Sequence, residues 1–321
     1  METQTSKTIG GYFQLSLEQG KEYYPDLIKL NTSRNALEYI LIVKGYTKIY
    51  LPYFTCEVLL EPIVRLNIKY QFYNINKELE PIIDFEIGPT ECLLYTNYFG
   101  LTQKTVKKLS ESIDNLIVDN AQAFFSKPLQ GTDTFYSCRK FFGVSDGAYL
   151  QINIDDRLVL EKDSSADRLR HLIGSIDYGI ENNYADFLDN EESLKDNYIK
   201  SMSLLTQALL RNVNYRECKR KRIENFRYLN DKLFLANELE IAFQDGIPAM
   251  VYPLLISKKG IKAKLIEKKI FVPTYWPNVF KWTTEDMFEH RLAKRTIYLP
   301  VDQRYNVSDM AYIVDFLKKI I

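Results

Sequence analysis

The first half of this chain alternates short apolar segments, rich in β-branched and aromatic residues, with segments of helical periodicity. Such alternation predicts βαβ units and a mainly parallel sheet covered by helices. Segments such as LLYTNYF and LIVDNA are apolar along most of their length, which indicates strands buried on both faces. We expect strands at 48–54, 69–75, 92–98, 115–120, 134–137 and 148–153, and helices at 33–43, 57–66 and 105–113.

The sequence pattern changes after about residue 155. Residues 156–240 are charged and helical. Because an α/β half is followed by this region and then by short strands and helices, we expect a large α/β domain over residues 1–210 and a small α+β domain over residues 211–321. In the second half we expect helices at 191–210, 219–235, 262–269 and 308–320, and strands at 249–257 and 270–275.

Charge and residue counts argue against several classes of protein. Lysine plus arginine and aspartate plus glutamate both number 42, so the formal net charge is zero and no nucleic-acid partner is expected. Four cysteines without CxxC spacing fit a reducing compartment. The two histidines, His171 and His290, are too few for a histidine-rich metal site. With no signal peptide and no apolar stretch of about 18 residues, we expect a cytoplasmic protein without a membrane span.

Asp119 ends an apolar strand, LIVD, at the edge where α/β sheets bind ligands. A buried carboxylate is costly unless a cation lies close to it. A protonated pyridine nitrogen would serve as that cation. The small residues that follow Asp119, Ala121 and Ala123, would let a ring approach the backbone. A cap or a turn residue is the more common role for an aspartate in such a position.

Lys140 follows the next strand, 21 residues after Asp119. A lysine at a strand end beside another cation, here Arg139, can have a lowered pKa and act as an amine nucleophile. Ser137 lies three residues earlier and could donate a hydrogen bond to an anion. Most lysines that follow strands are solvated surface residues, so the combination with Asp119 carries the prediction.

A possible anion site begins the first helix. The segment Asn31, Thr32, Ser33, Arg34 and Asn35 precedes an apolar helical run. Free N–H groups and the helix dipole at such a start favour a phosphate. The same residues also serve as ordinary N-caps.

Together these segments resemble the DegT/DnrJ/EryC1/StrS family of sugar aminotransferases, which depend on pyridoxal 5'-phosphate. The resemblance runs from about residue 26 to the C-terminus. It implies the aspartate aminotransferase fold (fold type I), with a mainly parallel seven-stranded-type sheet between helices and a small α+β C-terminal domain. The segment 119–123 (DNAQA) matches the family's Asp-x-Ala-x-Ala motif well. The segments 31–37, 51–56, 97–100 and 299–305 resemble its Gly-Thr-Ala, Pro-x-x-Thr, His-Leu-Tyr-Gly and closing Leu-Pro segments.

The resemblance also implies roles for single residues. Lys140 would bond covalently to the cofactor, Asp119 would pair with the pyridine nitrogen, and Gln122 would lie near the ring hydroxyl. The implied reaction moves an amino group from an amino-acid donor to a nucleotide-linked keto-sugar acceptor, in surface polysaccharide or related sugar biosynthesis, and the implied assembly is a homodimer. The other residues implied at the cofactor are Thr32, Ser33, Arg34, Asn35, Tyr53, Cys56, Asn97, Tyr98, Ser137 and Asn183.

The chain departs from the family pattern at several positions. Phe135 stands where the family has a serine five residues before the lysine, and Ser137 can substitute for it. Cys56 stands where an aromatic residue usually stacks on the cofactor, so Tyr53 or Tyr98 is expected to replace it. Residues 181–185 (ENNYA) only faintly resemble the partner-subunit segment Gly-x-Asn-Tyr-Arg.

Other interpretations remain open from the sequence. The scaffold could have diverged into an inactive protein that binds the cofactor or a sugar nucleotide, although retention of both Asp119 and Lys140 favours an enzyme. A Rossmann-type protein is disfavoured because no GxGxxG follows the first strand. Dehydration at a sugar carbon is disfavoured because in this family that reaction goes with histidine in place of the lysine. Trp276 and Trp282 could form an apolar substrate wall or pack in the core.

Overall fold

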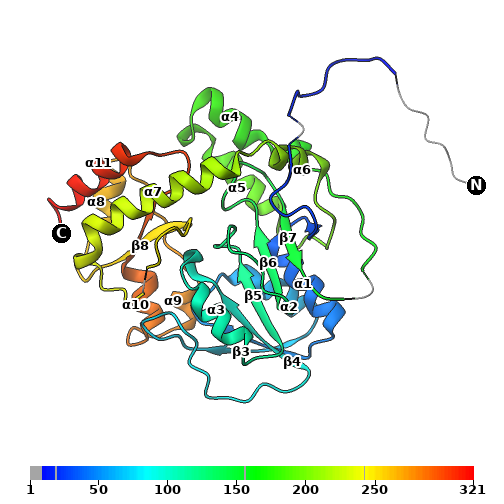
Figure 1. Ribbon diagram of the computed structural model, residues 1–321, viewed down its shortest axis with the longest axis horizontal. Coiled ribbons are helices and arrows are strands. Elements are labelled where there is room, and N and C mark those ends of the chain that lie inside the picture. The colour runs from blue at the N-terminus through cyan, green and yellow to red at the C-terminus, as the bar shows by residue number, and fades with distance from the viewer. Residues whose placement is uncertain (1–8, 19, 155–156, 242) are drawn as a thin grey trace, which may run out of the picture.

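A seven-stranded sheet forms the centre of the computed structural model, which describes residues 9–18, 20–154, 157–241 and 243–321 (Figure 1). The strand order is β1-β7-β6-β5-β4-β2-β3. Neighbours from β3 to β6 are parallel, whereas β7 is antiparallel to both β6 and β1. The strands are β1 (Ile28–Leu30), β2 (Lys48–Pro52), β3 (Lys69–Tyr73), β4 (Glu91–Thr96), β5 (Leu116–Asn120), β6 (Asp133–Ser137) and β7 (Ala148–Gln151).

The predicted mainly parallel sheet is confirmed, and so are its six predicted strands. Alternate residues of the central strands bury into two separate apolar clusters, one on each face. In β4, for example, Leu94 joins the cluster that contains the helix residues Leu37 and Ile40, while Leu93 and Tyr95 join the other. Burial on both faces explains why these strands are apolar along their whole length.

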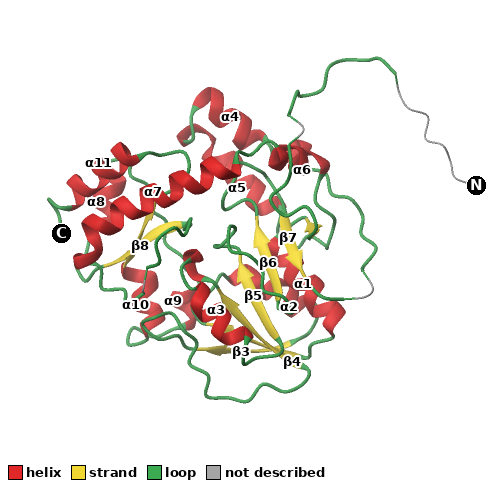
Figure 2. Ribbon diagram, viewed as in Figure 1, coloured by secondary structure: helices red, strands yellow, loops and turns green. Residues whose placement is uncertain are grey.

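The helices and short 3-10 turns before residue 212 connect and cover these strands. Figure 2 shows the helices arranged around the sheet. The helices are α1 (Ser33–Lys44), α2 (Leu60–Arg65), α3 (Gln103–Ser110), α4 (Arg170–Tyr178), α5 (Tyr184–Ser193) and α6 (Leu204–Arg211), and the turns are η1 (Glu57–Leu59), η2 (Tyr98–Gly100), η3 (Ala166–Arg168) and η4 (Glu181–Asn183).

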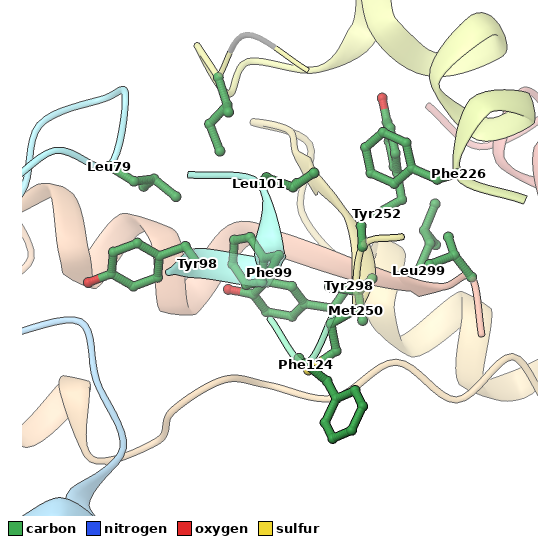
Figure 3. Close-up of a cluster of buried hydrophobic side chains, with 14 of the residues drawn as sticks. Leu79, Tyr98, Phe99, Leu101, Phe124, Phe226, Met250, Tyr252, Tyr298 and Leu299 are labelled. Atoms are coloured by element: carbon green, nitrogen blue, oxygen red, sulfur yellow. The ribbon is translucent and has the colours of Figure 1, made fainter. Parts of the chain in front are cut away.

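The C-terminal part contains a two-stranded antiparallel sheet, β8 (Val251–Leu255) and β9 (Thr296–Pro300), surrounded by helices. Its core continues into that of the large sheet, because the rings of Phe99 and Tyr298 lie 5.4 Å apart and the N–H of Met250 donates to the carbonyl of Phe99 (2.9 Å) (Figure 3). The helices are α7 (Tyr215–Leu233), α8 (Ile261–Glu267), α9 (Val279–Trp282), α10 (Phe288–Arg295) and α11 (Val307–Leu317), and the turn η5 is Phe234–Ala236.

Two predicted elements were wrong. The helix expected at 191–210 is interrupted, since α5 ends at Ser193 and α6 begins at Leu204. Between them the chain pairs with the end of β1 and the residue after it: the N–H of Asn31 donates to the carbonyl of Lys200 (3.0 Å), and Leu30 forms a β-bridge with Ser201. The Ser203 side chain then caps α6 by accepting from the N–H of Thr206.

The strand expected at 270–275 does not form, since these residues pair with no strand in the part of the chain that the structure describes. Ile270, Val272 and Trp276 are buried against the C-terminal core, so the apolar pattern there marks burial rather than sheet pairing. Pro273 also has no N–H to donate to a ladder. Across the described residues, no helix has both the length and the apolar character that crossing a membrane requires.

Candidate active site

The ends of three parallel strands bring the two main candidate residues to one edge of the sheet. Asp119 of β5 pairs in register with Thr96 of β4 and Phe135 of β6. Ser137 ends β6, and Lys140 follows it by three residues. The carboxyl edge of the sheet is therefore where Asp119, Ser137 and Lys140 gather, as the sequence predicts.

Asp119 is a buried carboxylate, with 6% of the residue exposed. Its Oδ1 accepts one hydrogen bond, from the N–H of Ala121 (2.8 Å). Burial raises its pKa, and the charge of Lys140 and the Ala121 N–H oppose that shift only in part. Among the described residues, no lysine or arginine nitrogen lies within ion-pair distance of this carboxylate. The site therefore lacks a close cation that Asp119 requires.

Lys140 lies in a tight turn just past β6. The carbonyl of Cys138 accepts from the N–H groups of both Phe141 and Phe142, each at 3.0 Å. The Lys140 residue is exposed, and its amine forms no ion pair with any residue that the structure describes. Within the same described part, the Ser137 hydroxyl also has no hydrogen-bond partner, although Ser137 is only 6% exposed. An amine and a hydroxyl are thus free at the edge that Asp119 faces.

Cys56 lies among the charges of this edge. Burial raises the pKa of its thiol, while Lys140 and Arg34 act to lower that pKa and Asp119 acts to raise it. The three charged groups that act on the thiol come from three other segments of the chain. Cys56 therefore belongs to the same cluster as Lys140 and Asp119.

The two tyrosines expected to stack on a cofactor have other partners. Tyr53 stacks on Phe72, with ring centroids 5.0 Å apart and planes inclined by 23°. Tyr98 is fully buried, and its hydroxyl donates to the carbonyl of Phe54 (3.0 Å). The Tyr98 ring thus lies in the core rather than at the open edge.

Asn97 and Gln122 hold the backbone of the turn after β4. Asn97 Nδ2 donates to Asn120 Oδ1 (2.9 Å), and its Oδ1 accepts from the N–H of Thr102 (3.2 Å). Gln122 Oε1 accepts from the N–H of Phe99 (3.1 Å), whose φ of 59° is unusual for a bulky residue. Both amides therefore stabilise a strained turn beside Asp119.

The start of α1 retains part of an anion site. The Thr32 hydroxyl caps the N–H of Asn35 (3.2 Å), and the Asn35 side chain donates to the carbonyl of Asn197 (2.8 Å). The Arg34 side chain pairs with Glu61. Within the described residues, the N–H groups of Ser33 and Arg34 have no partner, so two donors remain for an anion.

Asn183 is not brought to this edge. It lies in η4, and its Nδ2 donates to the carbonyl of Gly179 (2.8 Å). Its side chain also packs on Gly174, where an added Cβ would lie 2.1 Å from Asn183 Oδ1. Within one chain, Asn183 therefore stabilises the turn between α4 and α5.

Asp146 lies in the loop that follows Lys140. This carboxylate is fully buried, accepts from the Thr206 hydroxyl and the Ser203 hydroxyl, and lies 3.5 Å from Arg168 Nη2. It anchors α6 to the loop after Lys140 and is not available to a ligand.

The two tryptophans pack against aromatic side chains. Trp276 is buried and its ring lies 4.9 Å from that of Phe54, while the Trp282 ring lies 4.6 Å from that of Phe72. The core-packing alternative holds for Trp276. In the described part of the chain, no group of three or more His, Cys, Asp and Glu side chains could hold a metal ion.

Sequence reasoning did not identify two residues that contact the lysine turn. Arg222 of α7 and Gln303 both contact Phe141, the residue that follows Lys140. A signal was present for Arg222, because it lies at helical spacing from Cys218, Phe226 and Leu229 on the buried face of α7. A cation on an apolar face requires a specific set of partners.

Comparison with known proteins yields structural matches alone. No family model matches the chain, and no curated protein matches its sequence. Sugar aminotransferase CalS13 from Micromonospora echinospora superposes with a TM-score of 0.61 at 14% identity, covering 92% of this chain and 88% of that one. A DegT DnrJ EryC1 StrS aminotransferase from Brucella abortus gives 0.62 at 14% identity, covering 91% and 85%.

A third match decides the fold. The PLP-form of Spr1654 from Streptococcus pneumoniae gives a TM-score of 0.63 at 13% identity, covering 92% of this chain and 86% of that one. The chain shares the fold of these aminotransferase structures. The predicted fold type I, with its seven-stranded sheet and small C-terminal domain, is confirmed.

Proposed function

We propose that this chain is a pyridoxal-phosphate-dependent aminotransferase that moves an amino group from an amino acid to a keto sugar. The observation that carries the proposal is that Asp119 and Lys140 follow neighbouring strands to the same carboxyl edge of the sheet. Asp119 is buried, the charge of Lys140 acts on its pKa, and neither group has an ion-pair partner among the residues that the structure describes. The sugar aminotransferase fold supports the same reading of these two residues.

The residues present fit this cofactor. A protonated pyridine nitrogen would give Asp119 the cation that it lacks, and its phosphate would accept from the free N–H groups of Ser33 and Arg34 at the start of α1. The Ser137 hydroxyl is also free to donate. When bound, the cofactor supplies an electron sink for bonds at the donor α-carbon.

The chain's own groups then have distinct tasks. The Lys140 amine would hold the cofactor covalently and, when free, would act as the base that moves a proton at the donor α-carbon. The Asp119 carboxylate would keep the ring nitrogen protonated. Cys56, whose thiol pKa responds to the charges of Lys140 and Asp119, would lie beside the ring in place of an aromatic residue. Gln122 stays near the ring hydroxyl, while its Oε1 fixes the turn at Phe99.

The finer features of the proposal follow the resemblance. The acceptor is a nucleotide-linked keto sugar, the setting is surface polysaccharide or related sugar biosynthesis in the cytoplasm, and the enzyme is a homodimer in which Asn183 reaches the partner's site. The domain boundary falls near residue 210, where α6 ends at Arg211 and α7 begins at Tyr215.

The half-reaction with an amino donor tests the proposal. The wild-type protein, loaded with pyridoxal phosphate and freed of excess, is mixed with glutamate, glutamine and other amino acids in turn. We expect the visible band of the lysine-bound cofactor to disappear with one donor, with formation of one 2-oxo acid per site. Asp119→Asn should slow this conversion by a factor of about a hundred or more.

A matched substitution, Asp114→Asn, serves as the control because Asp114 lies before β5, outside the proposed site. A protein that binds the cofactor on Lys140 yet converts none of the donors would support the inactive binding protein instead.

A further inference from the structure

Arg222 is a fully buried cation on α7, with 1% of the residue exposed. Its Nε donates to Gln303 Oε1 (2.9 Å), and its Nη1 donates to the carbonyls of Ala249 (3.0 Å) and Met250 (3.2 Å). In the described part of the chain, no carboxylate lies within ion-pair distance of the guanidinium. Burial lowers the pKa of Arg222 to about 10, so the group stays charged at neutral pH.

The partners of Arg222 lead to the turn that carries Lys140. The guanidinium lies 4.5 Å from the centroid of the Phe141 ring, a distance typical of a cation–π contact. Gln303 Nε2 donates to the carbonyl of Phe141 (2.6 Å). Both the ring and the backbone of Phe141 are therefore held by residues from the C-terminal part of the chain, directly beside Lys140.

A second route connects Arg222 with Gln122. Arg222 Nη1 donates to the Met250 carbonyl, and the Met250 N–H donates to the Phe99 carbonyl (2.9 Å). The Phe99 N–H in turn donates to Gln122 Oε1 (3.1 Å). Figure 3 shows Phe99 beside Met250 in the cluster that joins the two parts of the molecule. Arg222 is thus connected through hydrogen bonds and ring contacts with residues that adjoin both Lys140 and Gln122.

An apolar residue could fill the Arg222 position without the cost of burying a charge. The guanidinium instead arranges carbonyl, amide and ring partners in one fixed geometry, as its planar set of donors allows. We propose that Arg222 and Gln303 are positioning residues that clamp Phe141 and thereby hold the Lys140 amine at the cofactor. This inference rests on the proposed function, in which Lys140 bonds to pyridoxal phosphate.

Two substitutions open the clamp while keeping apolar volume: Phe141→Leu removes the ring, and Gln303→Met removes both amide hydrogen bonds. Phe243→Leu is the matched control, because Phe243 packs on Phe226 and Tyr252 (5.4 and 5.7 Å) rather than on the lysine turn. Thermal unfolding of all three variants shows how much stability each has lost.

Hydrogen exchange of the cofactor-free proteins gives the first measurement. The amides of Phe141 and Phe142 donate to the Cys138 carbonyl, so a loosened turn exchanges them faster. We expect exchange in a peptide covering 138–144 to rise about tenfold in both clamp variants and to stay unchanged in Phe243→Leu. Unchanged exchange in the clamp variants would overturn the proposal.

The pH midpoint of the lysine-bound cofactor band gives the second measurement, which a purely structural role would leave unmoved. In Phe141→Leu and Gln303→Met, but not in Phe243→Leu, we expect this midpoint to shift and the binding of pyridoxal phosphate to slow by about tenfold or more. If the clamp variants have the same pH midpoint and the same rate of cofactor binding as Phe243→Leu, the positioning role is overturned. If the wild type captures no cofactor, the proposed function fails, and the exchange result still decides whether the clamp holds the turn.

Discussion

At the scale of single residues, the sequence predicts Asp119 and Lys140 because each breaks a local rule. A charged residue closes a buried strand, and a lysine follows the next strand end. The structure places both at one edge and leaves each without an ion-pair partner in the described residues. Arg222 and Gln303 escaped prediction because their contacts with Phe141 span 81 and 162 positions of the chain.

Asp119→Asn should stabilise the cofactor-free protein while slowing the reaction. Burial raises the pKa of Asp119, so the folded state binds its proton more tightly than the unfolded state does. The carboxylate therefore destabilises the fold increasingly as the pH rises from the unfolded pKa through the folded one. We expect the variant to gain on the order of 1 kcal/mol in free energy of unfolding at pH 7, measured in urea without cofactor.

The gain should vanish in acid, where both states of the wild type are protonated at this position. Repeating the urea titrations at pH 7 and near pH 3.5 separates this effect from a change in packing. A variant that is less stable than the wild type at neutral pH would show that the carboxylate has a stabilising partner in the fold.

At the scale of elements, patterns within a segment predict strands and helices well. They fail where the structure of a segment depends on pairing with a distant segment. In the large sheet, the six longer strands follow from apolar runs, whereas the three residues of β1 are too short to give a pattern. The break between α5 and α6 depends on hydrogen bonds from 197–201 to Asn31 and Asn35, about 165 positions away. Such a long-range contact leaves no periodicity in either segment.

Asn35→Ala tests this connection between elements. Asn35 is 1% exposed, and its Nδ2 donates to Glu38 Oε2 (2.9 Å) and to the Asn197 carbonyl (2.8 Å). Arg65 Nη1 also donates to both acceptors, so the variant loses two buried hydrogen bonds without leaving an acceptor unpaired, and the free energy of unfolding should fall by about 1–2 kcal/mol. Affinity for inorganic phosphate or cofactor should fall too, since the start of α1 loses its support.

The matched control is Asn182→Ala, because Asn182 is exposed and donates only to the nearby Tyr178 carbonyl. We expect its unfolding free energy to stay within about 0.5 kcal/mol of the wild type. Equal losses in the two variants would mean that the segment 197–201 does not hold the helix start.

At the scale of the whole molecule, the candidate site draws on both parts of the chain. The large sheet supplies Asp119 and Lys140, and the C-terminal part supplies the contacts that hold Phe141, Phe99 and the core between them. The sequence predicts both parts and their order, because strand and helix patterns change along the chain. It does not predict how they join, since that depends on side chains buried between them.

The covalent attachment of the cofactor to Lys140 is the central claim, and mass spectrometry tests it most directly. The protein is loaded with pyridoxal phosphate, reduced with borohydride and digested, alongside Lys140→Ala and the exposed control Lys104→Ala. The account predicts a reduced cofactor on the peptide that contains Lys140 in the wild type and in Lys104→Ala, and none in Lys140→Ala. A wild-type protein that carries no modification at Lys140, or an equal yield from Lys140→Ala, would contradict it.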